Sequence, residues 1–463
     1  MADVITRRLN LNDQRNRGRV SLPGDEGYVA ATSIWPKPVG RMPRAVVHCH
    51  AAEDVQLAIR IARDCDLPLS VRGGGHDWAG RALCEGIVID LTAMRGVIVD
   101  PALFCARIAG GARASDVLAA TEPHGLAAVT GSVGSVGMAG LTLGGGYGPL
   151  SGRFGLALDN LLAAEVVLAD GRIVVADDQN EQELLWALRG GGGNFGVVTR
   201  MLCRVHRLGS VRSGLLFFPL SETRAVLQGC ADIAAAAPDG LTAQVGCVAG
   251  ANGSLTTFVW PTWSGRPSDG ERQVAPFLKL GTVLAGSLEA KSYHASSTSF
   301  DPYLVKGLPT FMETCWVPSL GSASIEAVIE AMETAISPGC AVITHEFRGA
   351  ASRVPLEATA FGLRRDHVLI EILATTMGNT DKHEVQLHRD WARATLRAFD
   401  PVALPGGYPN LLAPGDVARA VQAYGPNAQR LAEAKRHYDP DNIFSSAIPL
   451  PVARQNRREV VGR

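Results

Sequence analysis

Residues 69–80 read LSVRGGGHDWAG, an apolar run that ends at Arg72 and is followed by three glycines and a histidine. The apolar run predicts a strand. Because glycine has no side chain, Gly73 to Gly75 let the backbone turn tightly and point successive N–H groups at an anion such as a pyrophosphate. We therefore expect a ligand-binding loop in which His76 reaches the ring system of the ligand. The alternative is that His76 is only a turn residue.

Glycine is abundant in the rest of the chain as well, with 51 glycines in 463 residues. This is about 11%, where about 7% is usual. A glycine recurs at every third position from 131 to 140, and residues 144–148 read GGGYG. The repeat is too short for a collagen helix. We expect residues 125–148 to thread through a tight space.

A third glycine run, Gly191-x-Gly193-x-x-Gly196, matches the dinucleotide-binding fingerprint letter for letter. That fingerprint needs a strand before it and a helix after it, so that the helix N-terminus meets the phosphates. Here a helical pattern comes first and the apolar β-type run VVTRMLCRV follows. The reversed order argues against a nicotinamide-binding Rossmann site.

The residue pattern of the chain changes at about residue 209, where the glycine clusters end. Before that point an Asp170-Gly171 turn between two apolar runs predicts a hairpin. After it, strands alternate with helices, which predicts an α+β domain with one broad sheet and helices on a face. The expected strands are 45–48, 67–71, 86–91, 96–99, 106–108, 163–168, 172–175, 197–205, 215–220, 255–260, 342–347 and 367–374. The expected helices are 52–65, 114–121, 181–187, 221–237, 324–336, 381–398, 414–424 and 428–438.

Charge and cysteine usage narrow the class of protein. Lys and Arg number 44 against 45 Asp and Glu, so the net charge of -1 argues against nucleic-acid binding. The nine cysteines contain no C-x-x-C pair, which predicts free thiols and neither a disulfide framework nor a metal site. Arg7 and Arg8 are not followed by an apolar segment, and no stretch approaches about 18 apolar residues. We expect a cytoplasmic protein without a membrane segment; the oligomeric state stays open.

Four segments together resemble the berberine bridge enzyme-like family of the vanillyl-alcohol oxidase/PCMH superfamily, in the order and spacing of that family. The resemblance covers about residues 25 to 450. It rests on SVRGGGHDWAG (70–80), GLAAVTGSVGSVGMAGLTLGGGYGPLSGRFGLALDN (125–160), LWALRGGGGNFGVVT (185–199) and YGPNAQRLAEAKRHYDPDNIF (424–444).

The resemblance implies an α+β fold with three segments. Residues 1–208 would form a PCMH-type FAD-binding domain of two subdomains. Residues 209–408 would form a substrate domain with one antiparallel sheet covered by helices. Residues 409–463 would return to the FAD domain, with Asp439 capping the bend that follows the last helix.

The resemblance also implies the cofactor, FAD. His76 matches the histidine that in this family bonds to the flavin 8α-methyl carbon. Val133 stands where many members have a cysteine bonded to flavin C6, so a single covalent link is implied, as in mono-covalent bacterial members. Val136 falls where the family lines oxygen access, and valine there goes with oxidases. The expected cofactor-binding residues are Arg72, Gly73, Gly74, Gly75, His76, Thr130, Gly131, Val136, Gly137, Gly140, Gly144, Gly145 and Val198.

Oxidation of an alcohol or amine by flavin needs a general base within about 3 Å of the proton that leaves. By resemblance, Glu346 of the run ITHEFRGA takes this part, with Ala350 in place of a glycine. Strand alternation would put Thr344 on the face of Glu346, and His345 on the opposite face. If Glu346 faces the flavin, burial should raise the pKa of its carboxyl group. The alternative is an exposed strand carboxylate.

Two further segments bear on the catalytic site. Tyr408 and Asn410 match the family's Y-x-N segment, but Leu411 replaces the tyrosine that usually follows. Residues 361–364 read FGLR where the family has F-P-H-R, so no named member's substrate can be carried over. Tyr147 in GGGYG either faces the pocket or packs in the core.

Taken together, these observations predict an FAD-dependent oxidase linked through His76 that uses molecular oxygen and releases hydrogen peroxide. The substrate would be a small alcohol, sugar-type molecule or amine. One alternative is a flavin dehydrogenase with another electron acceptor. Another is a flavin-holding protein without turnover, or a natural-product tailoring or cyclising flavoenzyme.

Overall fold

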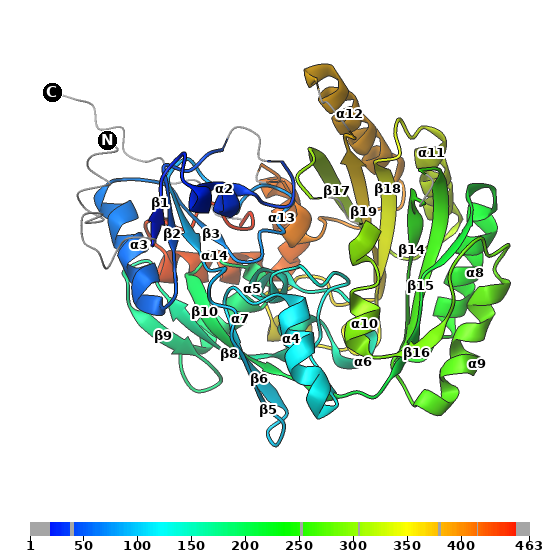
Figure 1. The fold of residues 1–463 in the computed structure, drawn as a ribbon, viewed down its shortest axis with the longest axis horizontal. Helices are drawn as coiled ribbons and strands as arrows, with labels where there is room; N and C mark the ends of the chain where they lie inside the picture. Colours follow the sequence, from blue (N-terminus) through cyan, green and yellow to red (C-terminus); the bar gives the residue numbers. More distant parts are fainter. Residues whose placement is uncertain are drawn as a thin grey trace.

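The computed structural model describes residues 19–37, 41–250, 253–303, 306–377, 381–413 and 415–450. Arg7 and Arg8 of the twin-arginine motif lie outside these ranges. Two sheets of the N-terminal region occupy one half of the molecule, and one larger sheet occupies the other (Figure 1).

The first sheet carries the glycine loop at the end of one of its strands. Its order is β1-β2-β4-β3, in which β2, β4 and β3 run parallel and β1 pairs antiparallel with β2. The strands are β1 (Val20–Ser21), β2 (Ala45–His48), β3 (Leu69–Arg72) and β4 (Ile87–Asp90). Helix α3 (Ala52–Asp64) makes the crossover, and its Val55 and Ile59 are buried in this sheet's core, as their helical spacing predicts.

The second sheet is antiparallel, in the order β5-β6-β10-β8-β9. Its strands are β5 (Val97–Asp100), β6 (Cys105–Ala109), β8 (Leu161–Val167), β9 (Ile173–Ala176) and β10 (Val197–Arg204). Strands β8 and β9 form the hairpin predicted at Asp170-Gly171. Helix α7 (Gln182–Gly191) precedes the third glycine run and β10 follows it, so the reversed order of the fingerprint is confirmed.

The third sheet has eight strands, all paired antiparallel, in the order β16-β12-β15-β14-β18-β19-β17 with β13 also on β15. They are β12 (Val211–Ser213), β13 (Leu216–Pro219), β14 (Leu241–Ala249), β15 (Leu255–Trp263), β16 (Glu289–Lys291), β17 (Thr310–Val317), β18 (Cys340–Phe347) and β19 (His367–Thr375). Helices α8 (Thr223–Ala235), α11 (Ser322–Glu333) and α12 (Lys382–Ala398) cover its outer face.

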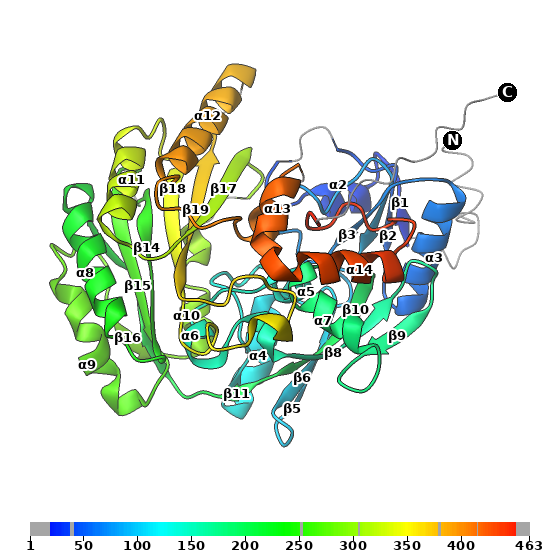
Figure 2. The same cartoon turned by 180° about the vertical axis from the view of Figure 1, so that it is seen from behind.

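The last part of the chain returns to the first half, where α13 (Val417–Tyr424) and α14 (Ala428–Tyr438) pack beside α7 (Figure 2). Asp439 accepts hydrogen bonds from the backbone N–H groups of Ile443 and Phe444 at 2.8 and 2.9 Å, so it caps the bend as predicted. Among the described residues, no helix is long and apolar enough to span a bilayer.

The remaining α-helices and strands are short. They are α2 (Glu26–Thr32), α4 (Ala114–Thr121), β7 (Leu126–Ala127), α5 (Met138–Gly144), α6 (Ser151–Phe154), β11 (His206–Arg207), α9 (Gly270–Val274) and α10 (Tyr293–Ser297). Helix α5 contains Gly140, the last glycine of the three-residue repeat, and Gly144, the first of GGGYG, so this part is helical and not only a threaded loop.

Candidate active site

A cavity of about 340 Å³ is lined by both halves of the molecule. The first half contributes the loop after β3, residues 131–147 and the start of β10, and the second contributes β14, β18 and β19. The predicted site residues that line it are Gly73, Gly74, Gly75, His76, Gly131, Val136, Gly137, Gly140, Tyr147, Val198, Tyr408 and Asn410. Those that do not are Arg72, Thr130, Gly144, Gly145 and Glu346.

The glycine loop is shaped by close backbone contacts. Gly75 has a φ of +68°, a left-handed conformation that favours glycine. A Cβ on Gly74 would overlap the backbone of Gly137, and a Cβ on Gly137 would overlap Gly74. The loop after β3 therefore packs directly on the 131–137 segment, and both sides need glycine.

Arg72, the last residue of β3, packs against the glycine loop. Its Nη1 donates to Asp90 Oδ1 at 3.1 Å, and the residue is 6% exposed. A Cβ on Gly75 would touch the Arg72 guanidinium. Arg72 therefore holds the loop against the neighbouring strand β4 instead of forming the cavity wall.

His76 is a buried imidazole in an aromatic setting. Its ring stacks on Trp35 with centroids 3.9 Å apart, and Trp78 meets it edge-on at 5.8 Å. Burial lowers the pKa of His76 to about 4, and the positive charges of Lys306 and Arg113 act in the same direction. Its Nε2 is buried without a hydrogen-bond partner in the described part of the chain. The ring is thus neutral at physiological pH, with a nitrogen lone pair available to a ligand.

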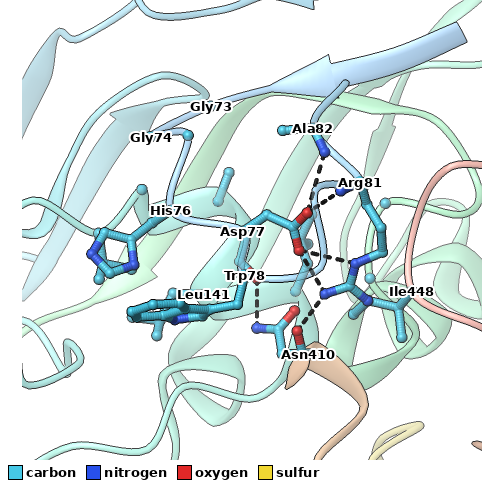
Figure 3. Close-up of a pocket in the computed structure, with 18 of the residues that line it drawn as sticks. Gly73, Gly74, His76, Asp77, Trp78, Arg81, Ala82, Leu141, Asn410 and Ile448 are labelled. Carbon is cyan, nitrogen blue, oxygen red and sulfur yellow. Dashed lines mark hydrogen bonds and ion pairs between the residues drawn. The ribbon is translucent and has the colours of Figure 1, made fainter. Parts of the chain in front are cut away.

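An ion pair ties the glycine loop to the segment that contains Tyr408. Arg81 donates to Asp77 Oδ1 from Nε and Nη2 at 2.9 and 2.8 Å, and also to the carbonyl oxygens of Pro409 and Asn410 (Figure 3). Asp77 and Arg81 line the cavity but were missed by the sequence analysis. Their signal was the four-residue spacing between Asp77, inside the motif LSVRGGGHDWAG, and Arg81, the residue that follows it, which suits an ion pair in a turn.

Tyr408 and Asn410 lie against the GGGYG segment. The Tyr408 hydroxyl oxygen accepts from the Gly146 N–H at 2.9 Å, and Asn410 Nδ2 donates to the Gly140 carbonyl at 3.1 Å. Side chains at residues 144 and 145 would collide with Asn410 and Tyr408, which explains two of the glycines outside the cavity wall. Burial raises the pKa of Tyr408 to about 12, so its hydroxyl keeps its proton.

Tyr147 lines the cavity with its ring, but its hydroxyl points elsewhere. It donates to His367 Nε2 at 2.7 Å, because His367 Nδ1–H is already directed at the Arg365 carbonyl at 2.7 Å. Burial raises the pKa of Tyr147 well above its usual value. The ring packs among Phe347 and Phe361, so Tyr147 is both cavity wall and core.

The structure does not bring Glu346 to this cavity. Thr344 and Glu346 do share a face of β18, as expected, but it is the face toward the helices, where Val342 packs in the core with α8 and α11. Glu346 Oε2 lies 3.4 Å from Arg348 Nε and accepts from the Ala243 N–H at 3.3 Å. Burial raises the pKa of the Glu346 carboxyl group, as expected, but the group lies beside Arg348 and does not line the cavity.

Asp77, which also lines the cavity, is already paired with Arg81. The carboxylate that lines it from the eight-stranded sheet is Glu371, on β19. Its Oε1 lies 3.2 Å from His345 Nε2, and the Gln244 side-chain amide lies 3.1 Å from the same nitrogen. The strand register explains the cluster, because Ile343 of the His345 face pairs with Glu371. Sequence reasoning missed Glu371, although it is the only carboxylate in the apolar strand HVLIEILAT.

Comparison with known proteins agrees with this geometry. The family described as FAD binding domain matches residues 43–177, and the family described as berberine and berberine like matches residues 408–451. (R)-6-hydroxynicotine oxidase from Paenarthrobacter nicotinovorans is 30% identical, covering 92% of this chain and 95% of its own. The chain belongs to the berberine bridge enzyme-like family. It is therefore an FAD-binding oxidoreductase.

Solved structures place this berberine bridge enzyme-like protein in the same fold. 6-Hydroxy-D-nicotine oxidase from Arthrobacter nicotinovorans superposes with a TM-score of 0.81 at 29% identity, over 92% of this chain and 96% of that one. The Physcomitrella patens BBE-like 1 protein has a TM-score of 0.85 at 22% identity, over 97% and 98%. The expected α+β, PCMH-type architecture is thus confirmed.

The residues of this enzyme fit FAD on chemical grounds. Successive N–H groups of a glycine loop suit a pyrophosphate. Gly73, Gly74, Gly75 and Gly137 line the cavity with backbone alone, so no side chain of their own covers their N–H groups. The unpartnered Nε2 of His76 marks a ring that faces a ligand and not the protein interior.

Proposed function

We propose that this enzyme is an oxidase whose FAD is attached covalently through His76. Its substrate is a small alcohol, sugar-type molecule or amine, and molecular oxygen is reduced to hydrogen peroxide. The observation that carries the proposal is that one cavity has the neutral His76 on the wall of the first half and the Glu371 carboxylate on the wall of the second. We propose that residues 1–208 form the FAD-binding domain and residues 209–408 the substrate-binding domain. Residues 409–463 form the C-terminal segment that returns to the FAD-binding domain.

The setting of His76 supports its role as the attachment point. A neutral imidazole is a nucleophile and a protonated one is not, so a pKa of about 4 keeps the reactive form at physiological pH. Trp35 fixes the ring plane by stacking, and its backbone N–H donates to the Gly75 carbonyl at 2.7 Å. Val133 lines the same cavity and has no nucleophile, which supports a single link.

FAD, when bound, supplies the electron acceptor: the substrate's hydride goes to the flavin, and oxygen then takes the two electrons as hydrogen peroxide. The protein must remove the O–H or N–H proton. Glu371 is suited to accept it, because it is the carboxylate on the cavity-facing side of β19. His345 at 3.2 Å and Gln244 beside it hold this carboxylate in place. Glu346 pairs with Arg348, so we assign it a part in stabilising the fold and none in contacting the substrate.

Tyr408 and Asn410 serve as a second polar wall of the site. In its hydrogen bonds with Gly146 and Asn410 the Tyr408 oxygen accepts, so its own proton can be donated into the cavity. Arg81 holds this segment by its bonds to the Pro409 and Asn410 carbonyls. We propose Tyr408 as a donor that orients substrate and Asn410 as the residue that positions Tyr408.

Oxygen use is tested without knowing the substrate. The purified enzyme is reduced with stoichiometric dithionite under argon and mixed with air-saturated buffer, while flavin absorbance and hydrogen peroxide are followed. Val136 lines the cavity, so Val136→Leu fills space that oxygen needs. We expect one peroxide per flavin, and reoxidation at least roughly tenfold slower in the variant, which corresponds to about 1.4 kcal/mol in the barrier. Slow reoxidation of the native enzyme with rapid oxidation by a quinone would instead make it a dehydrogenase.

A further inference from the structure

The wall that the eight-stranded sheet presents to the cavity is chemically uneven. Besides Tyr408, which belongs to the second polar wall, six described residues of this half line it, in two groups. Gln244, His345 and Glu371 form the polar group described above, while Phe300, Ile343 and Leu373 are apolar. The polar atoms of this wall are therefore gathered at one point.

The apolar part of the wall is aromatic and continues into the first half of the molecule. Phe300 packs on Phe258 and Trp260, with ring centroids 5.4 and 6.2 Å apart. Trp78, which also lines the cavity, packs against the same cluster from the loop after His76. Together, Trp78, Phe300, Ile343 and Leu373 make a broad apolar surface beside the polar group; we call these four residues the apolar wall.

Such a wall discriminates between substrate classes. A sugar carries a hydroxyl on nearly every ring carbon, and a hydroxyl buried without a hydrogen-bond partner loses its water at a net cost. A flat ring system instead gains by leaving water for aromatic and aliphatic neighbours. One polar point on this wall, with the Tyr408 hydroxyl on the second polar wall of the cavity, suits a molecule with few polar groups.

From this arrangement we infer that the substrate is a flat, mainly apolar ring compound, not an oligosaccharide. Its ring system lies against the apolar wall, and one hydroxyl or amine group donates its proton to Glu371. The hydrogen of the C–H bond next to that group would leave with both bonding electrons, as a hydride accepted by FAD, so the alcohol would become a carbonyl or the amine an imine. This inference rests on the proposed function and narrows its substrate class.

The test uses the holoenzyme under argon with three probes: 1-(2-naphthyl)ethanol, 1-(2-naphthyl)ethylamine and cellobiose. Binding is read as a shift of the flavin absorption band, and reduction as its bleaching. We expect at least one naphthyl probe to shift or bleach the flavin at concentrations at least tenfold below any effect of cellobiose. Whichever naphthyl probe bleaches the flavin identifies an alcohol or an amine substrate.

Variants of the apolar wall test its part in binding. Leu373→Gln places a polar group on the wall, so the affinity for the naphthyl probe should fall at least tenfold. Phe300→Asn is the second variant and should behave alike, while Phe300→Leu should recover most of the affinity. Leu387→Gln makes the same change on the exposed side of α12, where Leu387 is 46% exposed, and should leave the affinity unchanged.

Several results would overturn the inference. They are reduction of the flavin by cellobiose alone, no response to either naphthyl probe, or equal affinities of native enzyme and wall variants. The proposed function fails separately. A flavin that reoxidises quickly in air and gives peroxide, yet responds only to cellobiose, keeps the oxidase and rejects the ring compound. A protein whose reduced flavin does not react with oxygen rejects the oxidase regardless of the probes.

Discussion

Replacing Glu371 by glutamine should slow the reductive half-reaction while leaving the flavin bound. A positioned general base contributes about 10²- to 10⁴-fold to rate. We expect a loss at the lower end, about 10²-fold or about 2.7 kcal/mol, because His345 lies 3.2 Å from the lost carboxylate and can take over part of the proton transfer. Glutamine is nearly isosteric, so the cavity shape and the flavin content should stay the same.

The assay is anaerobic stopped-flow measurement of flavin bleaching with whichever naphthyl probe reduces the native enzyme. Glu346→Gln is the matched control, since it makes the same change on a carboxylate paired with Arg348 outside the cavity. We expect its bleaching rate to stay within a factor of about two, with a loss of roughly 1–3 kcal/mol in unfolding free energy. Loss of bleaching in Glu346→Gln together with a normal rate in Glu371→Gln would refute the assignment.

Two other predictions concern buried histidines. Trp35→Ala removes the ring stacked on His76 at 3.9 Å, so covalent incorporation of added FAD should slow roughly two- to tenfold. Trp35→Phe should largely restore the rate of incorporation. An unchanged rate in Trp35→Ala would reject a positioning role for Trp35. Burial lowers the pKa of His367 to about 3, so between pH 6.5 and pH 3 the unfolded chain binds one more proton at this residue and stability falls as the pH falls. His367→Gln should reduce the slope of unfolding free energy against pH, measured by urea titration at pH 5 and 6, by about 1.4 kcal/mol per pH unit; an unchanged slope would contradict a neutral buried His367.

Local patterns predicted much of the first half of the fold. The strand at 45–48 and the helix at 114–121 were found at their observed bounds, and the hairpin followed from its Asp-Gly turn. These elements depend on nearby residues, so sequence carries their signal. Strands β14 and β17 were not predicted, because polar residues such as Gln244 and Glu313 interrupt their apolar runs. Pairing along their whole length with β15 and β19 stabilises them.

The candidate site shows the same division. The glycine loop, His76, Tyr408 and Asn410 were found from motifs, and the structure gathers them around one cavity. Glu346, the residue predicted to be the base, does not line this cavity. Alternation along β18 correctly separated Glu346 from His345, but a period of two cannot tell which face the helices cover. That depends on the packing of α8 and α11, which no short segment encodes.

The contacts of Trp35 were beyond sequence reasoning for a related reason. Trp35 and His76 are separated by some forty residues and meet where the Trp35 backbone N–H donates to the Gly75 carbonyl. Asp77 and Arg81 gain their role from carbonyl groups at 409 and 410, at the far end of the chain. Such contacts follow from tertiary structure.

The central claim is the covalent flavin at His76, and acid precipitation of the purified protein tests it most directly. The denatured protein is separated on a gel and imaged for flavin fluorescence, beside His76→Ala and the Val133→Ala control. We predict fluorescence in the native and Val133→Ala bands and none in His76→Ala, whose yellow colour passes into the supernatant. A native band without fluorescence, or a fluorescent His76→Ala band, would contradict the claim.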